Sequence, residues 1–388
     1  MEHQKRHKLI WKILYPLCRL YMLIHFNFHP KDKGLPYPCL VVANHTTDLD
    51  PIMLGVALHK THLYFVASDH IFRKAFTAKL LMFLQSPIVR LKGTTADSTA
   101  LTAIRRLRKG CSVAVFAEGN RSFNGRTCAI IESTAKLARA SGAGLATVRF
   151  RGGYLSSPRW SGNSRRRGRM TSELVRVIPP EELKTMKPDE IAAIIRADIY
   201  EDAYETQRQS PIAYRGRRRA EHLERVLFYC PQCGGIGTLQ SRGNELSCSC
   251  GMKTTYNLYG FFEGGGLPWD NVYDWDLAQT EILKTRTEEA GDSPVFSDTD
   301  VVLTVSDSEK GETTLGEGGI FLFRDRMECC GRVFPFDRIA GMNISGPQML
   351  ELTSEGTHYR ISSPKIRCLR KYLTGYYAVT DPENILAV

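Results

Sequence analysis

The chain has 388 residues, which is enough for two or three domains that each bury their own core. Hydrophobic residues make up 43% of it and charged residues 24%, as is ordinary for a soluble or peripheral protein. The 11 cysteines are odd in number and we expect no cleavable signal peptide, which favours a reducing cytosol over a disulfide framework.

Positive charge is concentrated in the first part of the chain. Residues 1–229 hold 38 Lys and Arg against 19 Asp and Glu, whereas residues 230–388 hold 14 against 22. We therefore expect the first part to face an anionic partner, such as a membrane surface, phosphorylated substrates or nucleic acid.

The N-terminus pairs a basic stretch, residues 3–8, with an apolar run at residues 9–28. A clean membrane span of about 20 apolar residues is not expected, because polar residues and a proline interrupt the run. These are Lys12, Pro16, Arg19 and His25. We predict that residues 1–28 form an interfacial amphipathic helix on the cytoplasmic face of a membrane, peripheral or monotopic. A helix packed on the protein body is the alternative.

Residues 29–226 alternate between expected strands and expected helices. Strands are expected at 41–43, 63–67, 87–91, 112–117 and 145–149. Helices are expected at 51–58, 72–84, 97–109, 131–140 and 188–209. This alternation predicts an α/β domain whose active site lies at the ends of its strands.

The first candidate site follows the strand that ends at Ala43, in the stretch VVANHTTDLD (41–50). It supplies His45 and, after four intervening residues, Asp50. A neutral imidazole can act as a general base at pH 7, and a carboxylate that binds its other ring nitrogen fixes the tautomer. A lone histidine is more often a packing residue, so this candidate needs a second motif.

That second motif is FAEGNRS (116–122), at the end of another apolar strand. Together, HTTDLD and FAEGNRS resemble the HxxxxD and FPEGTRS motifs of the glycerophosphate acyltransferase superfamily, in particular the 1-acylglycerol-3-phosphate acyltransferases. The resemblance covers about residues 35–215. Ala117 and Asn120 depart from the family pattern, which puts the geometry of the substrate site in doubt.

The resemblance implies a role for each residue of the second motif. Glu118 would contact the glycerol hydroxyls, Arg121 would bind the phosphate, and Gly119 would keep the turn open. Arg90 matches a further phosphate-binding arginine of the family, with Lys92 as a reserve. The candidate substrate-binding residues are therefore Arg90, Lys92, Glu118, Gly119, Asn120 and Arg121.

The implied reaction moves a fatty acyl group from acyl-CoA or acyl carrier protein to the sn-2 hydroxyl of lysophosphatidate, which gives phosphatidate. No G-x-S-x-G motif is present, so direct attack by the acceptor hydroxyl is expected, with no metal or cofactor needed for catalysis. Another lysophospholipid or glycerol 3-phosphate is an alternative acceptor. A non-catalytic module that binds membranes or nucleic acid is the alternative from another class, although no nucleic-acid-binding motif supports a nucleic-acid partner.

Four cysteines predict a structural zinc site in residues 227–260. Cys230 and Cys233 form a CxxC pair, and Cys248 and Cys250 form a CxC pair, with 14 residues between the pairs. Four thiolates make a closed tetrahedral site, which is typical of a zinc ribbon. An iron–sulfur site and an unliganded loop are the alternatives.

The rest of the chain is expected to be rich in strands. Residues 261–300 are expected to form a mainly irregular linker with at least one short helix. Residues 301–388 show short alternating runs separated by turn signals, followed by a closing helix at 363–378. This order resembles a PH- or GRAM-like β-barrel, on architecture alone.

Overall fold

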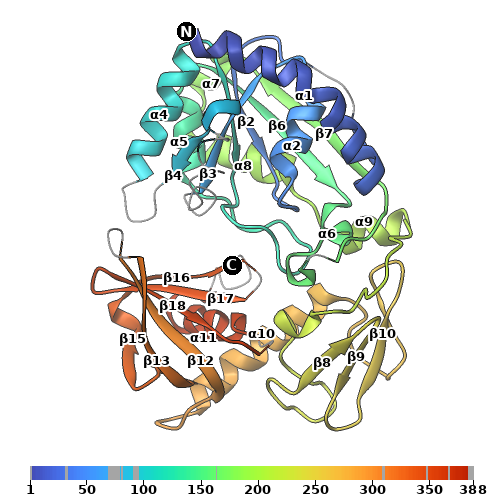
Figure 1. Cartoon of the computed structure of the whole chain (residues 1–388), viewed down its shortest axis with the longest axis vertical. Helices are drawn as coiled ribbons and strands as arrows, with labels where there is room; N and C mark the ends of the chain where they lie inside the picture. Colours follow the sequence, from blue (N-terminus) through green and yellow to red (C-terminus); the bar gives the residue numbers. More distant parts are fainter. Residues whose placement is uncertain are drawn as a thin grey trace. The chain divides into compact units, whose positions relative to one another are not determined.

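The computed structural model describes residues 2–30, 34–68, 79, 82–90, 96–162, 164–307, 311–346, 348–365 and 368–382 (Figure 1). The chain divides into two compact units. The first unit comprises Met1–Arg121, Arg126–Ser156 and Arg167–Thr206. The second unit comprises Ser122–Gly125, Ser157–Arg166 and Gln207–Val388. The first unit ends at residue 206 in this division, and two short segments of the first half belong to the second unit. The expected domain boundary at residue 226 stays a prediction.

A seven-stranded sheet forms the centre of the first unit, in the order β1-β7-β6-β2-β5-β3-β4. Its strands are β1 (Phe28–Pro30), β2 (Cys39–Ala43), β3 (Leu63–Ser68), β4 (Ile88–Arg90), β5 (Ser112–Phe116), β6 (Gly144–Arg151) and β7 (Met170–Ile178). From β6 to β4 all neighbours are parallel, whereas β7 is antiparallel to β6. The five expected strands are present, while β1 and β7 were not expected.

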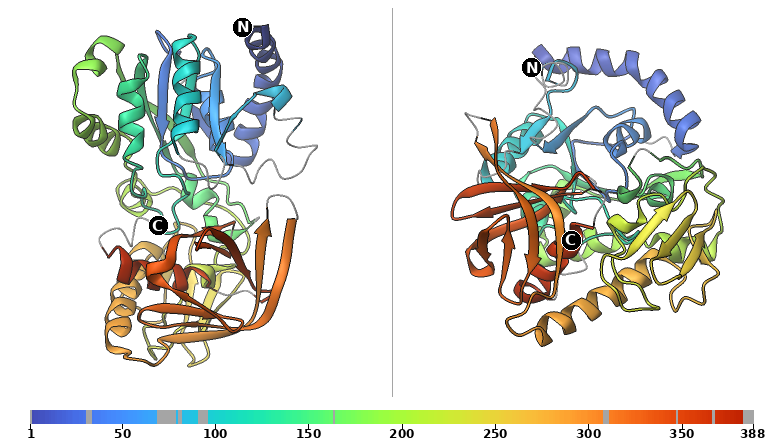
Figure 2. Two further views of the ribbon diagram at one scale, coloured as in Figure 1. Left: turned by 90° about the vertical axis from the view of Figure 1, so that its left-hand side faces the viewer. Right: turned by 60° about the horizontal axis from the view of Figure 1, so that its bottom comes forward.

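Helices cover both faces of this sheet, as the edge-on view in Figure 2 shows. The described helices in this part of the chain are α1 (Glu2–Phe26), α2 (Asp50–Ala57), α4 (Ala96–Arg108), α5 (Ser133–Ala140), α6 (Gly153–Ser156), α7 (Pro180–Thr185), α8 (Pro188–Ile199) and α9 (Ala203–Gln209). One face packs against α1 and α2, and the other against α4, α5, α7 and α8. Because β2 is buried on both faces, its sequence is a continuous apolar run.

Two expected helices differ from the structure. The helix expected at 72–84 lies mostly outside the described residues. The helix expected at 188–209 is divided into α8 and α9. At the break, the N–H of Glu201 donates to Oγ1 of Thr127 at 2.8 Å, and the N–H of Thr127 donates to the carbonyl of Glu201 at 3.0 Å. A tertiary contact therefore ends α8, not a proline or glycine.

Helix α1 has one buried and one exposed apolar face. Met22 and Phe26 are each 1% exposed and belong to the core. Five apolar residues on the other face are between 52% and 65% exposed: Leu9, Ile13, Leu17, Leu20 and Ile24. Among the described helices, Gln4–Phe26 alone is long and apolar enough to cross a membrane, by length and composition. An exposed apolar face of this kind suggests membrane association.

The second unit contains two antiparallel sheets. The smaller has the order β11-β10-β9-β8, with β8 (Leu239–Arg242), β9 (Glu245–Cys248), β10 (Lys253–Tyr256) and β11 (Phe262–Glu263). The larger has the order β15-β14-β13-β12-β18-β17-β16. Its strands are β12 (Phe296–Asp307), β13 (Gly311–Leu322), β14 (Arg326–Cys329), β15 (Arg332–Pro335), β16 (Ile339–Ser345), β17 (Met349–Ser354) and β18 (Thr357–Ser362). The C-terminal part is therefore mainly β, and its PH- or GRAM-like character stays a prediction.

Two helices of the second unit differ from expectation. The closing helix, α11 (Arg370–Thr380), begins seven residues after the expected start at residue 363. The segment 261–300 is not mainly irregular, since it holds the 18-residue helix α10 (Val272–Glu289). The buried side of α10 carries polar residues beside Trp275 and Leu283, so no simple apolar stripe marks it in the sequence. Short 3-10 turns lie at Arg159–Ser161, Leu223–Arg225 and Phe336–Arg338.

Candidate active site

The two sequence motifs meet at the carboxyl edge of the parallel strands. β2 and β5 are neighbours, and Ala43 pairs with Phe116 at their ends. The residues that follow these strands therefore emerge side by side. The backbone N–H of His45 donates to Oε1 of Glu118 at 2.5 Å, although the two residues are 73 positions apart.

His45 and Asp50 form the pair expected from the HxxxxD spacing. Nδ1 of His45 lies 3.0 Å from Oδ2 of Asp50, and the Asp50 side chain is fully buried while that of His45 is 21% exposed. An ionised carboxylate can only accept, so Nδ1 carries a proton, and in a neutral ring Nε2 then keeps its lone pair. The ring of Phe116 stacks on His45 at 4.5 Å between centroids. The arrangement orients the imidazole in the way a general base requires.

A tight turn holds the Asp50 carboxylate. Its Oδ2 accepts the backbone N–H of Thr46 at 2.5 Å and that of Thr47 at 2.9 Å, and its Oδ1 accepts the Thr47 hydroxyl at 2.7 Å. The backbone of Gly153 packs closely on this turn. A Cβ atom added at Gly153 would lie only 2.0 Å from Oγ1 of Thr46. Sequence reasoning did not single out these residues, although the two threonines stand between His45 and Asp50 in the motif.

Asn44 is a second residue that the sequence analysis left without a role. Its Nδ2 donates to the carbonyl of Phe150 at 2.9 Å, and its Oδ1 accepts the N–H of Phe150 at 2.7 Å. The side chain thus binds both backbone groups of a residue on β6, just beyond the end of β2. This fixes the direction in which the chain leaves the sheet before His45.

Glu118 is buried, with a relative exposure of 7% for the whole residue. Its second oxygen, Oε2, accepts the N–H of Cys128 at 2.6 Å, so backbone N–H groups occupy both oxygens. Burial raises the pKa of Glu118 to about 8, although these two N–H donors oppose the rise. In this structure Glu118 joins the two motif loops. The contact with glycerol hydroxyls that the resemblance implies stays a prediction.

The remaining candidates of the second motif follow Glu118 in the chain. Gly119 has a φ of +71°, a backbone conformation that favours glycine, and Asn120 is half-buried. Nε of Arg121 lies 3.1 Å from Oδ1 of Asp48, whose side chain is 79% exposed. The structure thus brings Arg121 beside the His45 turn.

Two phosphate-binding candidates are less fully described. Arg90 is the last residue of β4, so its backbone lies on the same edge of the sheet as His45. The side chain of Arg90, and Lys92 as a whole, lie outside the described residues. Their predicted role stays a prediction.

The four cysteines of the second unit have the geometry of a metal site. Their sulfur atoms all lie within 4.8 Å of one another. Sγ of Cys230 is 3.7 Å from that of Cys250, and Sγ of Cys233 is 3.8 Å from that of Cys248. A tetrahedron with Zn–S bonds of about 2.3 Å has edges of about 3.8 Å. The residues present therefore fit a zinc ion, and occupancy stays a prediction.

Comparisons with known proteins address the segment that carries both motifs. Residues 25–151 match the family model described as Acyltransferase. No curated protein matches the chain significantly. Among solved structures, the 1-acyl-sn-glycerophosphate (LPA) acyltransferase PlsC from Thermotoga maritima matches with 18% identity and a TM-score of 0.40. That match covers 50% of this chain and 80% of the other. The family match supports an acyltransferase domain in this part of the chain.

Proposed function

We propose that this protein transfers a fatty acyl group from a thioester donor to the sn-2 hydroxyl of lysophosphatidate. The observation that carries the proposal is the His45–Asp50 pair, 3.0 Å apart at the carboxyl end of β2. The match of residues 25–151 to the Acyltransferase family supports the reaction class. The lysophosphatidate acceptor rests on the resemblance of the two motifs.

His45 acts as the general base in this mechanism. Its Nε2 takes the proton of the acceptor hydroxyl as the alcohol oxygen attacks the thioester carbonyl. Asp50 stabilises the imidazolium that forms, through the bond to Nδ1. The tetrahedral intermediate collapses, the C–S bond breaks, and the imidazolium returns its proton to the leaving thiolate. General-base assistance of this kind contributes about 10²–10⁴-fold to the rate.

Arg121 binds the acceptor phosphate in this proposal. Its guanidinium is paired with Asp48, whose side chain is largely exposed. Because the Asp48 side chain is largely exposed, its carboxylate can turn into water and a phosphate can replace it. A guanidinium offers a phosphate two parallel N–H bonds. Arg90 and Lys92 are the further candidates for the same phosphate.

The membrane supplies the acceptor. The exposed apolar face of α1 supports binding at a lipid surface. We infer attachment to the cytoplasmic face, where acyl-CoA or acyl carrier protein can deliver the donor. In the second unit, a zinc ion bound by four cysteines would hold the small sheet together without an open position for chemistry.

The experiment that tests the function is acyl transfer to lysophosphatidate from labelled acyl-CoA, with the wild type beside His45→Ala. We expect the variant to lose at least 10²-fold in kcat while its circular dichroism is unchanged. His29→Ala is the matched control, because His29 is exposed on β1 and away from the motifs. Near-normal turnover by His45→Ala would show that His45 is not the base.

The acceptor is tested in the same assay. Lysophosphatidate is compared with other lysophospholipids and with glycerol 3-phosphate, each with acyl-CoA and with acyl carrier protein as donor. A higher kcat/KM for another acceptor would show that this compound, and not lysophosphatidate, is the preferred acceptor. The proposed general-base mechanism would be unchanged. No transfer with any pair of substrates would instead favour a non-catalytic binding module.

A further inference from the structure

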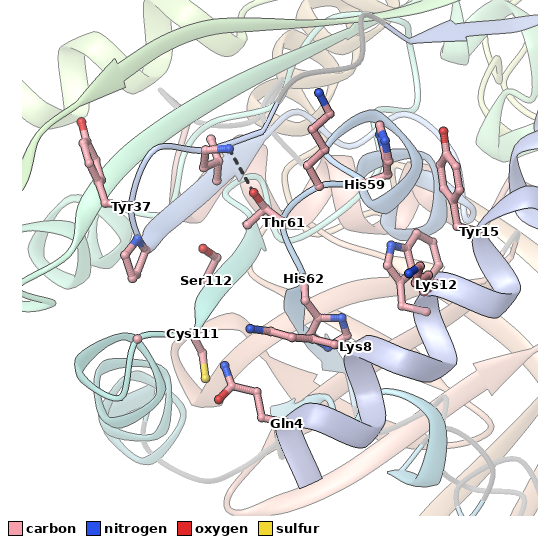
Figure 3. Close-up of a pocket in the computed structure, with 15 residues that line it drawn as sticks. Gln4, Lys8, Lys12, Tyr15, Tyr37, His59, Thr61, His62, Cys111 and Ser112 are labelled. Carbon is pink, nitrogen blue, oxygen red and sulfur yellow. Dashed lines mark hydrogen bonds between the residues drawn. The ribbon is translucent and has the colours of Figure 1, made fainter. Parts of the chain in front are cut away.

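The first unit has a cavity at the edge of the sheet opposite to the candidate active site (Figure 3). It has a volume of about 510 Å³, within the usual range of small-molecule sites. Pro38, His62 and Cys111 line it, and they stand at or just before the first residues of β2, β3 and β5. His45 lies two residues after the last residue of β2, and a five-residue strand spans about 17 Å. We call this space the basal cavity.

The walls of the basal cavity are basic. Lys8 and Lys12 project from α1, and Lys60 comes from the connection between α2 and β3, which also contributes His59 and His62. Among the described residues that line the cavity, none is an aspartate or glutamate. The three lysines make this lining positively charged, which attracts an anion.

His62 adds polar groups that have no partner within the protein. Neither ring nitrogen of His62 has a hydrogen-bond partner among the described residues, and both atoms are buried. Leaving a buried polar atom unpaired costs about 1–3 kcal/mol. Burial, with the charges of His7 and Lys8, lowers the pKa of His62 to about 4, so the ring is neutral at pH 7. A neutral imidazole can donate one hydrogen bond to a ligand and accept another.

Aromatic side chains form the rest of the walls. The ring of Tyr15 stacks on His59, with centroids 4.5 Å apart and an angle of 16° between the planes. Trp11 is held in place by packing, because a Cβ at Gly55 would lie 3.0 Å from its ring. Tyr37 faces them from the other side of the cavity (Figure 3). The cavity thus combines cationic groups with fixed aromatic surfaces.

The orientation of α1 decides which kind of anion can enter. Successive residues of an α-helix are about 100° apart around its axis. On α1, the mean direction of the cavity-lining residues is therefore about 150° from the mean direction of the exposed apolar residues. The lining residues are Gln4, Lys8, Trp11, Lys12 and Tyr15. A membrane that contacts the apolar face therefore lies on the far side of α1 from the cavity. Lipid headgroups are poorly placed to reach it, whereas a dissolved anion is not restricted in this way.

We propose that the basal cavity is a second binding site, separate from the active site, for a water-soluble ligand that carries a phosphate group. Lys8, Lys12 and Lys60 bind the phosphate, and His62 supplies a neutral hydrogen-bonding group. Because the lysines come from both α1 and the body of the first unit, the bound ligand ties the membrane-facing helix to the sheet. The site would thereby link the concentration of a phosphorylated solute to the attachment of α1.

The test uses the fluorescence of Trp11 in the full chain in detergent micelles, titrated with inorganic phosphate. Potassium chloride at matched ionic strength is the salt control, and Trp11→Phe identifies the part of the signal that comes from the cavity. We expect a saturable change whose half-saturation concentration rises at least tenfold in the double variant Lys8→Ala/Lys60→Ala. Both lysines are exposed, so the double variant is expected to fold. Lys136→Ala, an exposed lysine on α5, is the matched control.

Two further arms separate the possible sources of the signal. Arg121→Ala should keep the response, because the phosphate proposed for the active site lies at the other edge of the sheet. Neutral vesicles with and without phosphatidate test the lipid source. A response to phosphatidate vesicles but not to inorganic phosphate would overturn the soluble ligand. A phosphate response that survives in the double lysine variant, or no response at all, would overturn the site.

Discussion

The carboxylate of Glu118 accepts the backbone N–H of His45 at 2.5 Å, and this one hydrogen bond joins the two motif loops. Its other oxygen accepts the N–H of Cys128 at 2.6 Å. Glu118 therefore sets the position of the backbone that carries the proposed base. A residue that acts in this way affects catalysis through His45 even if it never touches the substrate.

Glu118→Gln should reduce kcat at least tenfold above about pH 8, where the carboxyl group is ionised, because the amide group can accept only one of the two N–H bonds and places its own NH2 against the other donor. Glu118→Asp, which keeps the charge but shortens the side chain, should recover little activity. The measurement is steady-state kinetics beside circular dichroism. Full activity of Glu118→Gln would refute the positioning role.

The raised pKa of Glu118 predicts that the stability of the protein depends on pH. The pKa of Glu118 is raised in the folded state, to about 8, so the folded state binds this proton more tightly than the unfolded state. Its contribution to the free energy of unfolding is complete below about pH 4.5 and is lost as the pH rises towards 8. The loss is at most about 1.4 kcal/mol per pH unit. Urea unfolding at pH 6 and pH 8 should show a smaller difference for Glu118→Gln than for the wild type.

Gly153→Ala should disturb the turn that holds Asp50. The added Cβ would lie 2.0 Å from Oγ1 and 2.7 Å from Cβ of Thr46, so the turn must move. Overpacking of this kind costs about 1–3 kcal/mol, and we expect a loss of kcat as well. Gly341→Ala is the matched control, because a Cβ there meets no atom within 4 Å. Equal activity in the two variants would argue against the turn as a catalytic support.

Arg121→Lys should raise KM for the phosphorylated acceptor about tenfold and leave KM for the acyl donor near its wild-type value. Lysine keeps the charge but loses the paired N–H geometry that binds a phosphate. Arg139→Lys, at an exposed position on α5, is the control. Equal rises in both KM values would assign Arg121 to the phosphates of the donor instead.

Asp276→Asn should destabilise the second unit by about 3–5 kcal/mol, because it removes the carboxylate partner of a buried guanidinium. Asp276 is fully buried, Arg370 is 2% exposed, and their two hydrogen bonds measure 2.5 and 2.9 Å. Asp325→Asn breaks an exposed pair with Arg326 and should have almost no effect. Chemical unfolding of the three proteins gives the comparison.

The Asp276 variant should also affect the acceptor. Nδ2 of Asn124 donates to Asp276 at 2.9 Å, and Asn124 lies three residues after Arg121 in the segment Ser122–Gly125 of the second unit. Loosening this segment should raise KM for the acceptor. An unchanged KM in folded Asp276→Asn would show that the segment does not position Arg121.

Native mass spectrometry should find one zinc ion per chain, and a chelator should expose residues 230–250 to proteases. Removing the metal breaks the bonds that would link the four cysteines to one another, so the segment that carries them is no longer held together. Cys248→Ser should have the same effect, whereas Cys18→Ser should not. A folded, metal-free protein with unchanged protease resistance would rule out the zinc site.

Much of the candidate site could be predicted from the sequence, since short-range patterns determine it. The apolar run before Asn44 and the spacing of His45 and Asp50 predicted a strand end that carries a polar pair, and the structure has this pair at 3.0 Å. The spacing of the four cysteines likewise predicted a cluster whose sulfur atoms do come together. In these cases the chain needs only one turn, or one small hairpin, to bring the groups together.

Other features depended on contacts between distant parts of the chain. The sequence of α10 shows no clear apolar stripe, because its buried Asp276 is stabilised by Arg370, 94 residues away. The end of α8 is fixed by hydrogen bonds to Thr127.

The role of Glu118 and the existence of the basal cavity also depended on contacts between distant parts of the chain. Local sequence patterns report turns and periodicity, whereas the burial of a polar group is settled only when its partner folds against it. The sequence by itself therefore determined the five parallel strands of the first sheet and the spacing of the motifs at their ends. The tertiary structure decided which polar side chains are buried, which backbone groups hold His45, and which lysines surround a common space.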